Sequence, residues 1–249
     1  MKRKGIFLSI IVCSKNNRVQ LERTLSSLSP IKDFEIIAVL NGYDSKTVKA
    51  LKNFFNSVTF IIDESNGLYN AMNQGAKVSS GNYLMFLNAG DELYSQQSLK
   101  ILVEEAVKRN SKWAFGQIMM MKKNGKFRLT NLKNYSPFLH KFSVQFVPHP
   151  ACIFQNELFS SFGGYDSNYE IIADQKLCLQ FSRIELPLVS NELISLFNLG
   201  GASSRSNIEI VKDFRILSQE FHNQILTRFF SNIIFIFVYL LRVLKHRKI

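Results

Sequence analysis

An α/β fold with a mostly parallel central sheet and helices on both faces is predicted by the order of apolar segments along the chain. Short runs rich in β-branched residues at positions 7–13, 34–40, 58–62 and 83–87 have the length and composition of strands covered on both faces. Between these runs, apolar residues recur every three or four positions, as in amphipathic helices. Strands that alternate with helices at this spacing form parallel βαβ units with right-handed crossovers.

Capping residues and apolar faces predict the helices of this first half. Asn17 precedes an apolar helical pattern and Asp44 precedes a second, and both side chains are good N-caps. Leu68, Met72 and Ala76 form the apolar face of a third helix. The rhythm changes after these units. The later segments we expect are a helix at 95–108, a hairpin with strands at 113–121 and 126–130, an irregular aromatic segment at 131–148 that shapes a pocket, and helices at 156–162 and 174–183.

The charge balance favours an anionic partner. Lysine and arginine number 31 against 19 acidic residues, a net charge of +12, which suits a nucleotide diphosphate, an acidic lipid surface or a nucleic acid. The chain has no basic stripe with interleaved aromatic residues, so we expect no nucleic-acid partner. Three scattered cysteines and the absence of a cleavage site after the first apolar run predict a cytoplasmic catalytic part.

The C-terminal segment differs from the rest of the chain. Residues 229–241 carry no charge, and Arg242, Lys245, Arg247 and Lys248 follow them. As a helix, this run spans about 20 Å, against about 30 Å of bilayer hydrocarbon. We expect an interfacial helix on the anionic inner face of the cell membrane. The alternative is a helix that packs on the catalytic domain or on a second subunit.

Polar residues follow each of the four predicted parallel strands. They include Ser14, Asn41, Glu64 and the turn from Asn88 to Asp91. Because ligands of parallel α/β sheets bind beyond the carboxyl ends of the strands, we expect a binding site there. No Gly-x-Gly-x-x-Gly or Gly-x-x-x-x-Gly-Lys sequence is present, which argues against a dinucleotide dehydrogenase and a P-loop protein.

Several segments together resemble a known family. They are Ser9-Ile10-Ile11-Val12, Phe34-Glu35-Ile36-Ile37, Asn66-Gly67-Leu68-Tyr69-Asn70-Ala71-Met72-Asn73-Gln74-Gly75, Gly81 to Asp91, His149-Pro150-Ala151, Gly164-Tyr165-Asp166 and Ile172-Ala173-Asp174. This pattern is similar to family-two glycosyltransferases of the GT-A fold, in particular those that act in colanic acid, capsule and O-antigen assembly. The resemblance covers roughly residues 6 to 205.

The resemblance implies a divalent metal, Mg²⁺ or Mn²⁺, bound at the Asp-x-Asp motif that ends the fourth strand. Here Asn88 and Gly90 stand where the two aspartates usually are, and Asp91 is the acid that remains. We therefore expect Asp91 to be the metal ligand and Asn88 a contact to the donor. The alternative for Asp91 is a cap in an ordinary loop at the end of a strand.

Asp174 matches the position of the family's general base, which deprotonates the acceptor hydroxyl during inversion. Its alternative is a plain N-cap of the helix that starts there. Gln175 stands where a second acid or an aromatic residue is common. His149 resembles a histidine near the acceptor or the diphosphate, and a structural role is its alternative.

Donor-binding residues are also implied by the resemblance. Ser14, Asn41, Glu64 and Asn73 are the expected contacts to a UDP- or GDP-sugar. Arg205, which follows a glycine-rich and serine-rich loop, is expected to close over the diphosphate, and a simple turn is the alternative.

The sequence thus predicts a metal-dependent, inverting glycosyltransferase that transfers a sugar to a lipid-linked saccharide. Its expected domains are a catalytic domain at 1–205, divided near residues 92 and 93 into a nucleotide-binding half and an acceptor-binding half, and C-terminal helices at 206–249. Two alternatives remain. One is a non-catalytic scaffold on a degenerate glycosyltransferase fold, and the other is a sugar nucleotidyltransferase, which lacks support from an Arg-containing, Gly-rich loop after the first strand.

Overall fold

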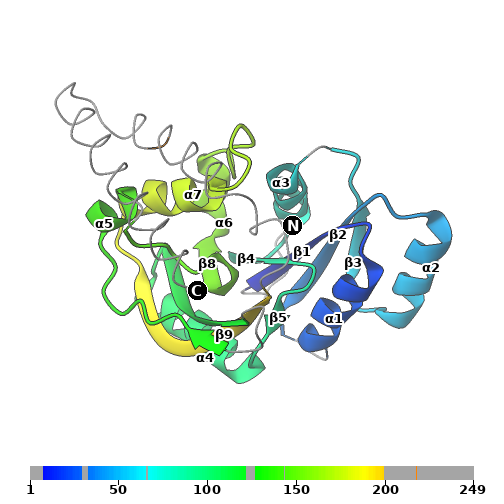
Figure 1. Cartoon of the computed structure of the whole chain (residues 1–249), viewed down its shortest axis with the longest axis horizontal. Coiled ribbons are helices and arrows are strands. Elements are labelled where there is room, and N and C mark those ends of the chain that lie inside the picture. The colour runs from blue at the N-terminus through cyan, green and yellow to red at the C-terminus, as the bar shows by residue number, and fades with distance from the viewer. Residues whose placement is uncertain are drawn as a thin grey trace, which may run out of the picture.

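The computed structural model describes residues 8–29, 33–65, 67–121, 127–142 and 144–198, together with Leu217. Within these residues, nine strands form one sheet, and helices cover both of its faces (Figure 1). The predicted α/β class is therefore confirmed. The elements of the first half are β1 (Leu8–Lys15), α1 (Arg18–Leu28), β2 (Glu35–Asn41), α2 (Ser45–Phe54), β3 (Thr59–Ile62), α3 (Leu68–Val78) and β4 (Tyr83–Asn88).

The first half is the parallel part of the sheet, with the strand order β3-β2-β1-β4. All three pairings in it are parallel, and each strand matches its predicted range to within one or two residues. Side chains of β1 alternate between the two faces, as the pleat of a strand requires. Ile10 and Val12 pack in one core with α1, whereas Ile11 and Cys13 pack in the other with α3. Both faces of β1 are therefore buried, as its apolar run predicts.

The second half extends this sheet through strands of mixed direction. Its elements are β5 (Glu92–Leu93), α4 (Gln96–Arg109), β6 (Trp113–Met121), β7 (Phe127–Leu129), α5 (Pro137–Lys141), the 3₁₀ turn η1 (His149–Ala151), β8 (Cys152–Gln155), α6 (Asn156–Ser161), α7 (Ala173–Ser182) and β9 (Leu188–Asn198). Strand β8 lies antiparallel between β4 and β6, and β9 lies parallel to β6. The predicted hairpin is present as the antiparallel pair β6 and β7, and its turn lies outside the described residues.

Two elements of the second half do not follow from the sequence pattern. The segment expected to be irregular at 131–148 contains α5, which Ser136 caps by accepting a hydrogen bond from the backbone N–H of Leu139. Strand β9 was not predicted, because its sequence Leu-Val-Ser-Asn-Glu-Leu-Ile-Ser-Leu-Phe-Asn breaks the apolar alternation. Its pairing with β6 is irregular at the same place, with register shifts between Phe115 and Ile118.

The carboxyl ends of the parallel strands meet at one edge of the sheet, as predicted. The backbone N–H of Asn16 donates to the carbonyl of Asn41 at 2.9 Å, and that of Asp63 donates to the carbonyl of Leu40 at 2.8 Å. On the other side of β1, the N–H of Ala89 donates to the carbonyl of Cys13 at 2.9 Å. These bonds fix the loops after β1, β2, β3 and β4 side by side.

The predicted C-terminal helices at 206–249 lie outside the described residues, except for Leu217. That side chain is fully buried in the core that contains α3 and α7. In the part of the chain that the structure describes, none of the helices has the length and apolar character needed to span a membrane.

Candidate active site

A cavity of about 530 Å³ lies at the carboxyl edge of the parallel strands. Its walls come from the loops after β1, β2, β3 and β4 and from the start of α3, and we name it the donor cavity. Three of the residues predicted to bind the donor line it, namely Ser14, Asn41 and Asn88. The hydroxyl of Ser14 is 2.6 Å from the hydroxyl of Tyr43, and the Asn41 amide donates to the carbonyls of Asp63 and Ser65. Asn41 therefore shapes the loop after β3 as well as the cavity.

Three buried oxygen atoms of the donor cavity lack a hydrogen-bond partner among the described residues. They are Oδ2 of Asp63, Oγ of Ser65 and Oδ1 of Asn88. The carboxylate of Asp63 is 4% exposed, and its other oxygen accepts the backbone N–H of Ser65 at 3.1 Å. Buried polar atoms are nearly always paired, so these three indicate a polar ligand. The same carboxylate, after the larger effect of burial, helps to raise the pKa of Cys13.

The side chain of Asp91 stabilises the turn from Asn88 to Asp91. The Asp91 carboxylate accepts the backbone N–H of Asn88 at 3.2 Å, and the side chain is 3% exposed. Asp91 is not among the described residues that line either cavity, whereas Asn88 lines both. The N-cap of the following helix α4 is Ser95 rather than Asp91. That Asp91 is a metal ligand stays a prediction.

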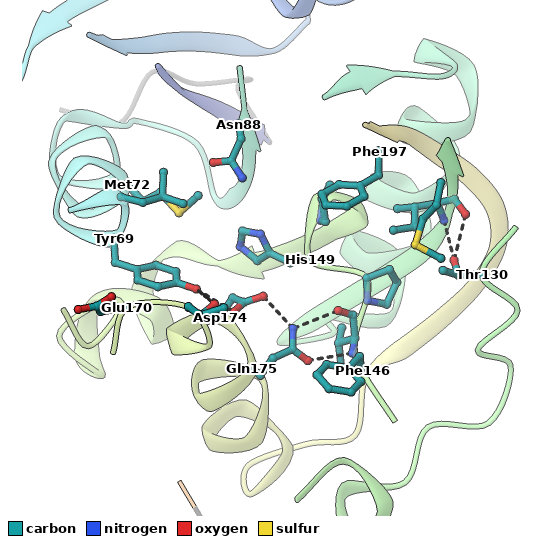
Figure 2. Close-up of a pocket in the computed structure, with 17 residues that line it drawn as sticks. Tyr69, Met72, Asn88, Thr130, Phe146, His149, Glu170, Asp174, Gln175 and Phe197 are labelled. Carbon is teal, nitrogen blue, oxygen red and sulfur yellow. Dashed lines mark hydrogen bonds between the residues drawn. The ribbon is translucent and has the colours of Figure 1, made fainter. Parts of the chain in front are cut away.

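A second cavity of about 340 Å³ adjoins the donor cavity, and Leu68 and Asn88 line both. We name it the base cavity because Asp174, which matches the base position of the resembling family, lines it (Figure 2). Asp174 is in the first turn of α7, whose N-cap is Ile172, so the capping alternative for Asp174 is not realised. One carboxylate oxygen lies 3.0 Å from the hydroxyl of Tyr69, which it shares with the carbonyl of Ile171, and the other accepts the Gln175 amide at 2.7 Å. Both oxygens are thus oriented by neighbouring side chains.

Gln175 is in turn fixed by a buried polar network. Its Nε2 donates to the carbonyl of Val147 at 3.2 Å, and its Oε1 accepts the N–H of Val147 at 3.0 Å. The same Oε1 is 2.9 Å from Nε2 of His140. Because an amide oxygen only accepts, Nε2 of neutral His140 carries the proton, and Nδ1 accepts the hydroxyl of Tyr135 at 2.8 Å. Burial lowers the pKa of His140 to about 4, although the bond to Gln175 opposes the shift, so the neutral form prevails at neutral pH.

His149, which the resemblance places near the acceptor or the diphosphate, is buried in the 3₁₀ turn η1. It lines the base cavity, and its Nε2 is 2.8 Å from the hydroxyl of Tyr165. Burial lowers the pKa of His149, and the charge of Asp174 opposes that effect. Burial also raises the pKa of Tyr165 well above its usual value. The side chains of His149 and Tyr165 are therefore both neutral at neutral pH. Their hydrogen bond holds His149 in the wall of the base cavity.

The remaining predicted residues lie elsewhere. Glu64 is exposed and is not among the described residues that line the two cavities. Asn73 binds the backbone of Tyr165 twice, with its amide donating to the carbonyl at 2.8 Å and its oxygen accepting the N–H at 2.8 Å. These contacts join α3 to the loop before α7, which is a structural role. Arg205 lies outside the described residues.

Three residues of the site were not singled out from the sequence. Asp63 follows β3 directly and precedes Glu64, the residue predicted to contact the donor. Only the burial of Asp63 identifies it as the better candidate for that contact. Tyr69 belongs to an apolar helix face in the sequence, yet its hydroxyl reaches Asp174, 105 positions away. His140 lies in the segment expected to be irregular. No local pattern in the sequence links Tyr69 or His140 to Asp174.

The sequence model of the family described as Glycosyl transferase family 2 matches residues 9–162, more than half of the chain. The chain therefore belongs to glycosyl transferase family 2, and it is a glycosyltransferase. The matched residues contain both the parallel half of the sheet and the turn at Asn88.

Two groups of known proteins are similar to it. An uncharacterized glycosyltransferase of Mycobacterium tuberculosis strain H37Rv is 28% identical over 207 residues, which cover 79% of this chain and 77% of that protein. A PGL/p-HBAD biosynthesis glycosyltransferase of Mycobacterium bovis strain BCG is 28% identical over 173 residues, covering 67% and 66%. Among solved structures, S. aureus TarS 1-349 in complex with UDP-GlcNAc superposes with a TM-score of 0.70 at 15% identity, covering 92% of this chain and 70% of that one. This last likeness supports the GT-A fold.

Proposed function

We propose that this glycosyltransferase transfers a sugar, with inversion, from a UDP- or GDP-sugar to a hydroxyl of a lipid-linked saccharide of the cell surface. The observation that carries the proposal is the Asp174 carboxylate, oriented in a cavity that adjoins the donor cavity at Asn88. A nucleotide sugar in the donor cavity and an acceptor in the base cavity would meet at this boundary. The TarS structure with UDP-GlcNAc, which has the same fold, supports a nucleotide-sugar donor.

In the proposed step, the acceptor oxygen forms a bond to the anomeric carbon while the bond from that carbon to the diphosphate oxygen breaks. Asp174 receives the proton of the acceptor hydroxyl, and the nucleoside diphosphate leaves with the bonding electrons. Tyr69 and Gln175 contact this carboxylate, which lines the cavity (Figure 2). Inversion requires the base and the diphosphate to act on opposite faces of the sugar, and two cavities that meet at Asn88 would allow this arrangement.

The donor set at the end of β4 fits a hard divalent cation such as Mg²⁺ or Mn²⁺. The Oδ1 of Asn88 is an unpartnered buried oxygen, and oxygen is the ligand that these cations prefer. Among the described residues, no cluster of three His, Cys, Asp or Glu side chains is able to hold a metal ion, so the diphosphate would have to supply further ligands. Asn88 and, as the sequence predicts, Asp91 would hold the cation, which supplies charge neutralisation for the departing diphosphate.

The test is release of nucleoside diphosphate from a panel of UDP- and GDP-sugars with Mn²⁺, with extracts of lipid-linked saccharides as acceptor. Asp174→Asn should lower transfer at least about a hundredfold, in the range of lost general-base catalysis. Asp33→Asn is the matched control, because Asp33 is exposed, pairs with Lys100 and is not among the described residues that line either cavity. Full activity of Asp174→Asn would refute the base assignment. Donor binding without turnover by the wild type would favour the non-catalytic alternative.

Anomeric configuration and membrane binding are separate parts of the proposal. NMR of the product should show the anomeric configuration opposite to that of the donor, and retention would exclude direct displacement. We place the protein in the cytoplasm, peripherally on the anionic inner face of the membrane, because residues 229–241 are uncharged and are followed by Arg242, Lys245, Arg247 and Lys248. Full-length protein should float with vesicles that contain anionic lipid and should not float with neutral ones. Equal behaviour with both would remove the electrostatic argument.

A further inference from the structure

One wall of the base cavity is apolar. Ile118 and Met120 of β6 and Phe197 of β9 form it, and Phe146 and Pro148 continue it toward α7. Figure 2 shows Phe197 and Phe146 on the side of the cavity away from Tyr69 and Met72. Phe146 is 39% exposed, so the wall reaches the mouth of the cavity. An acceptor that presents its hydroxyl to Asp174 would lie along this wall.

Most polar side chains of the same cavity already have partners within the protein. Both ends of the Gln175 amide bind Val147, and Nε2 of His149 is paired with Tyr165. The hydroxyl of Thr130 accepts the N–H of Ile118 at 2.9 Å and lies 3.1 Å from its carbonyl. A sugar ring with several hydroxyls needs many free hydrogen-bonding groups, since each polar group that is buried without a partner weakens binding. Beside Asp174, this cavity offers the unpartnered oxygen of Asn88, which the donor cavity shares, and the exposed side chain of Glu170.

We propose that the acceptor carries an apolar group next to its reacting hydroxyl, and that Ile118, Met120 and Phe197 bind this group. The inference rests on the proposed function, because it takes the base cavity to be the acceptor site. The proposed apolar group is a hydrocarbon surface of a few carbon atoms. Two kinds of acceptor would present such a surface: one with an aryl or alkyl aglycone attached to its sugar, and one with the methyl group of a deoxy sugar. Removing such a surface from water supplies affinity without hydrogen bonds.

Matched pairs of simple glycosides test the proposal and distinguish its two sources. We would measure binding to the full-length protein with UDP and Mn²⁺ present, by saturation-transfer NMR and calorimetry. An aglycone site predicts that phenyl and octyl β-D-glucoside bind about tenfold more tightly than methyl β-D-glucoside. A site for a deoxy sugar predicts that methyl L-fucoside binds about fourfold more tightly than methyl L-galactoside, which differs by one hydroxyl. Equal affinity within both pairs would overturn the proposal.

Variants on a single strand locate the binding. Met120→Gln keeps the length of the side chain and places an amide in the wall, so it should abolish the preference within the responding pair. Met119→Gln is the matched control, because successive residues of β6 point to opposite faces and Met119 is not among the described residues that line the cavity. Equal loss in both variants, or no loss in Met120→Gln, would place the binding elsewhere and contradict the assignment.

A second pair of variants, at exposed positions, distinguishes loss of binding from loss of folding. Phe146→Ser removes a cavity residue that is 39% exposed, and Phe138→Ser removes a neighbour that is 66% exposed and outside the cavity. Only the first should weaken binding of the apolar glycoside. Release of UDP from UDP-sugars should be unchanged in the two control variants, Met119→Gln and Phe138→Ser, whose residues are not among those described as lining the cavity. If the wild type itself turns over no donor, the proposed function fails, whereas normal turnover without apolar preference refutes this inference alone.

Discussion

The buried imidazole of His140 makes the stability of this protein depend on pH in a defined window. The side chain is fully buried, with Gln175 on one ring nitrogen and Tyr135 on the other. Burial, as the largest cause, lowers its pKa from the usual 6.5 to about 4 in the folded protein. The unfolded chain therefore binds more protons than the folded chain between these two values. Stability is fully present above pH 6.5 and is lost as the pH falls toward 4.

The size of this effect follows from the two pKa values. With 6.5 for the unfolded chain and about 4 for the folded one, the linkage relation gives a loss of roughly 2 kcal/mol between pH 7 and pH 4.5. His149 contributes in the same direction, because burial lowers its pKa too. Other groups add their own pH dependence. The difference between wild type and His140→Gln therefore isolates the contribution of this one imidazole.

Urea unfolding at pH 7 and at pH 4.5, followed by fluorescence, measures this difference. The chain has one tryptophan, Trp113, and its side chain is fully buried in the core beside α7, so its emission reports unfolding. We expect the wild type to lose about 2 kcal/mol more between the two pH values than His140→Gln loses. The variant's lower stability at pH 7 cancels in the comparison. The same loss in both proteins would show that His140 does not titrate between folded and unfolded states as its burial requires.

Three further predictions concern the site and its support. Gln175→Ala should lower kcat about tenfold with the donor KM unchanged, because it removes a hydrogen bond to Asp174 and leaves the donor cavity intact. A change in the donor KM alone would contradict the role of Gln175 in orienting Asp174. Asp63→Asn should raise the donor KM about tenfold with little change in kcat, because the carboxylate has an unpartnered oxygen in the donor cavity, and steady-state kinetics with UDP-sugars checks both variants. Gly164→Ala should destabilise the protein by about 2 kcal/mol, because the residue has φ +80 and a Cβ atom would lie 2.5 Å from Oδ1 of Asn73. A melting temperature equal to the wild type's would show that the loop relaxes.

The parallel half of the fold was predictable because its signals are local. Each strand is a short apolar run, and helices α1 and α2 have the caps Asn17 and Asp44, whose side chains accept the expected backbone N–H. The chemistry of parallel sheets then places the polar residues after these strands at one edge. Ser14, Asn41 and Asn88 were found in this way, and they line the donor cavity.

The residues that orient Asp174 were not predictable, because they reach it through contacts between distant parts of the chain. Tyr69 lies on the buried face of α3, and nothing in its own segment shows that its hydroxyl reaches Asp174. The apolar alternation of strand β9 is interrupted, so its own sequence does not predict a strand. Its parallel pairing with β6 stabilises the extended conformation. Asp91 was selected from the motif alone. Its carboxylate accepts the backbone N–H of Asn88, and metal binding by this acid stays a prediction.

If the proposed function holds, the network around Gln175 links acceptor selection to the orientation of Asp174, the proposed base. The amide of Gln175 binds Asp174 and the backbone of Val147, and Val147 is flanked by Phe146 and Pro148 of the apolar wall. A shift of this backbone would therefore move the amide that holds the base, because one Nε2 group donates to both partners. Changes in the side chain of Phe146 should act on acceptor affinity, whereas changes that displace the backbone at Val147 should also lower kcat. Relatives with the same fold would then be able to alter the exposed wall residues freely, but would have to preserve the path of the chain between His140 and His149.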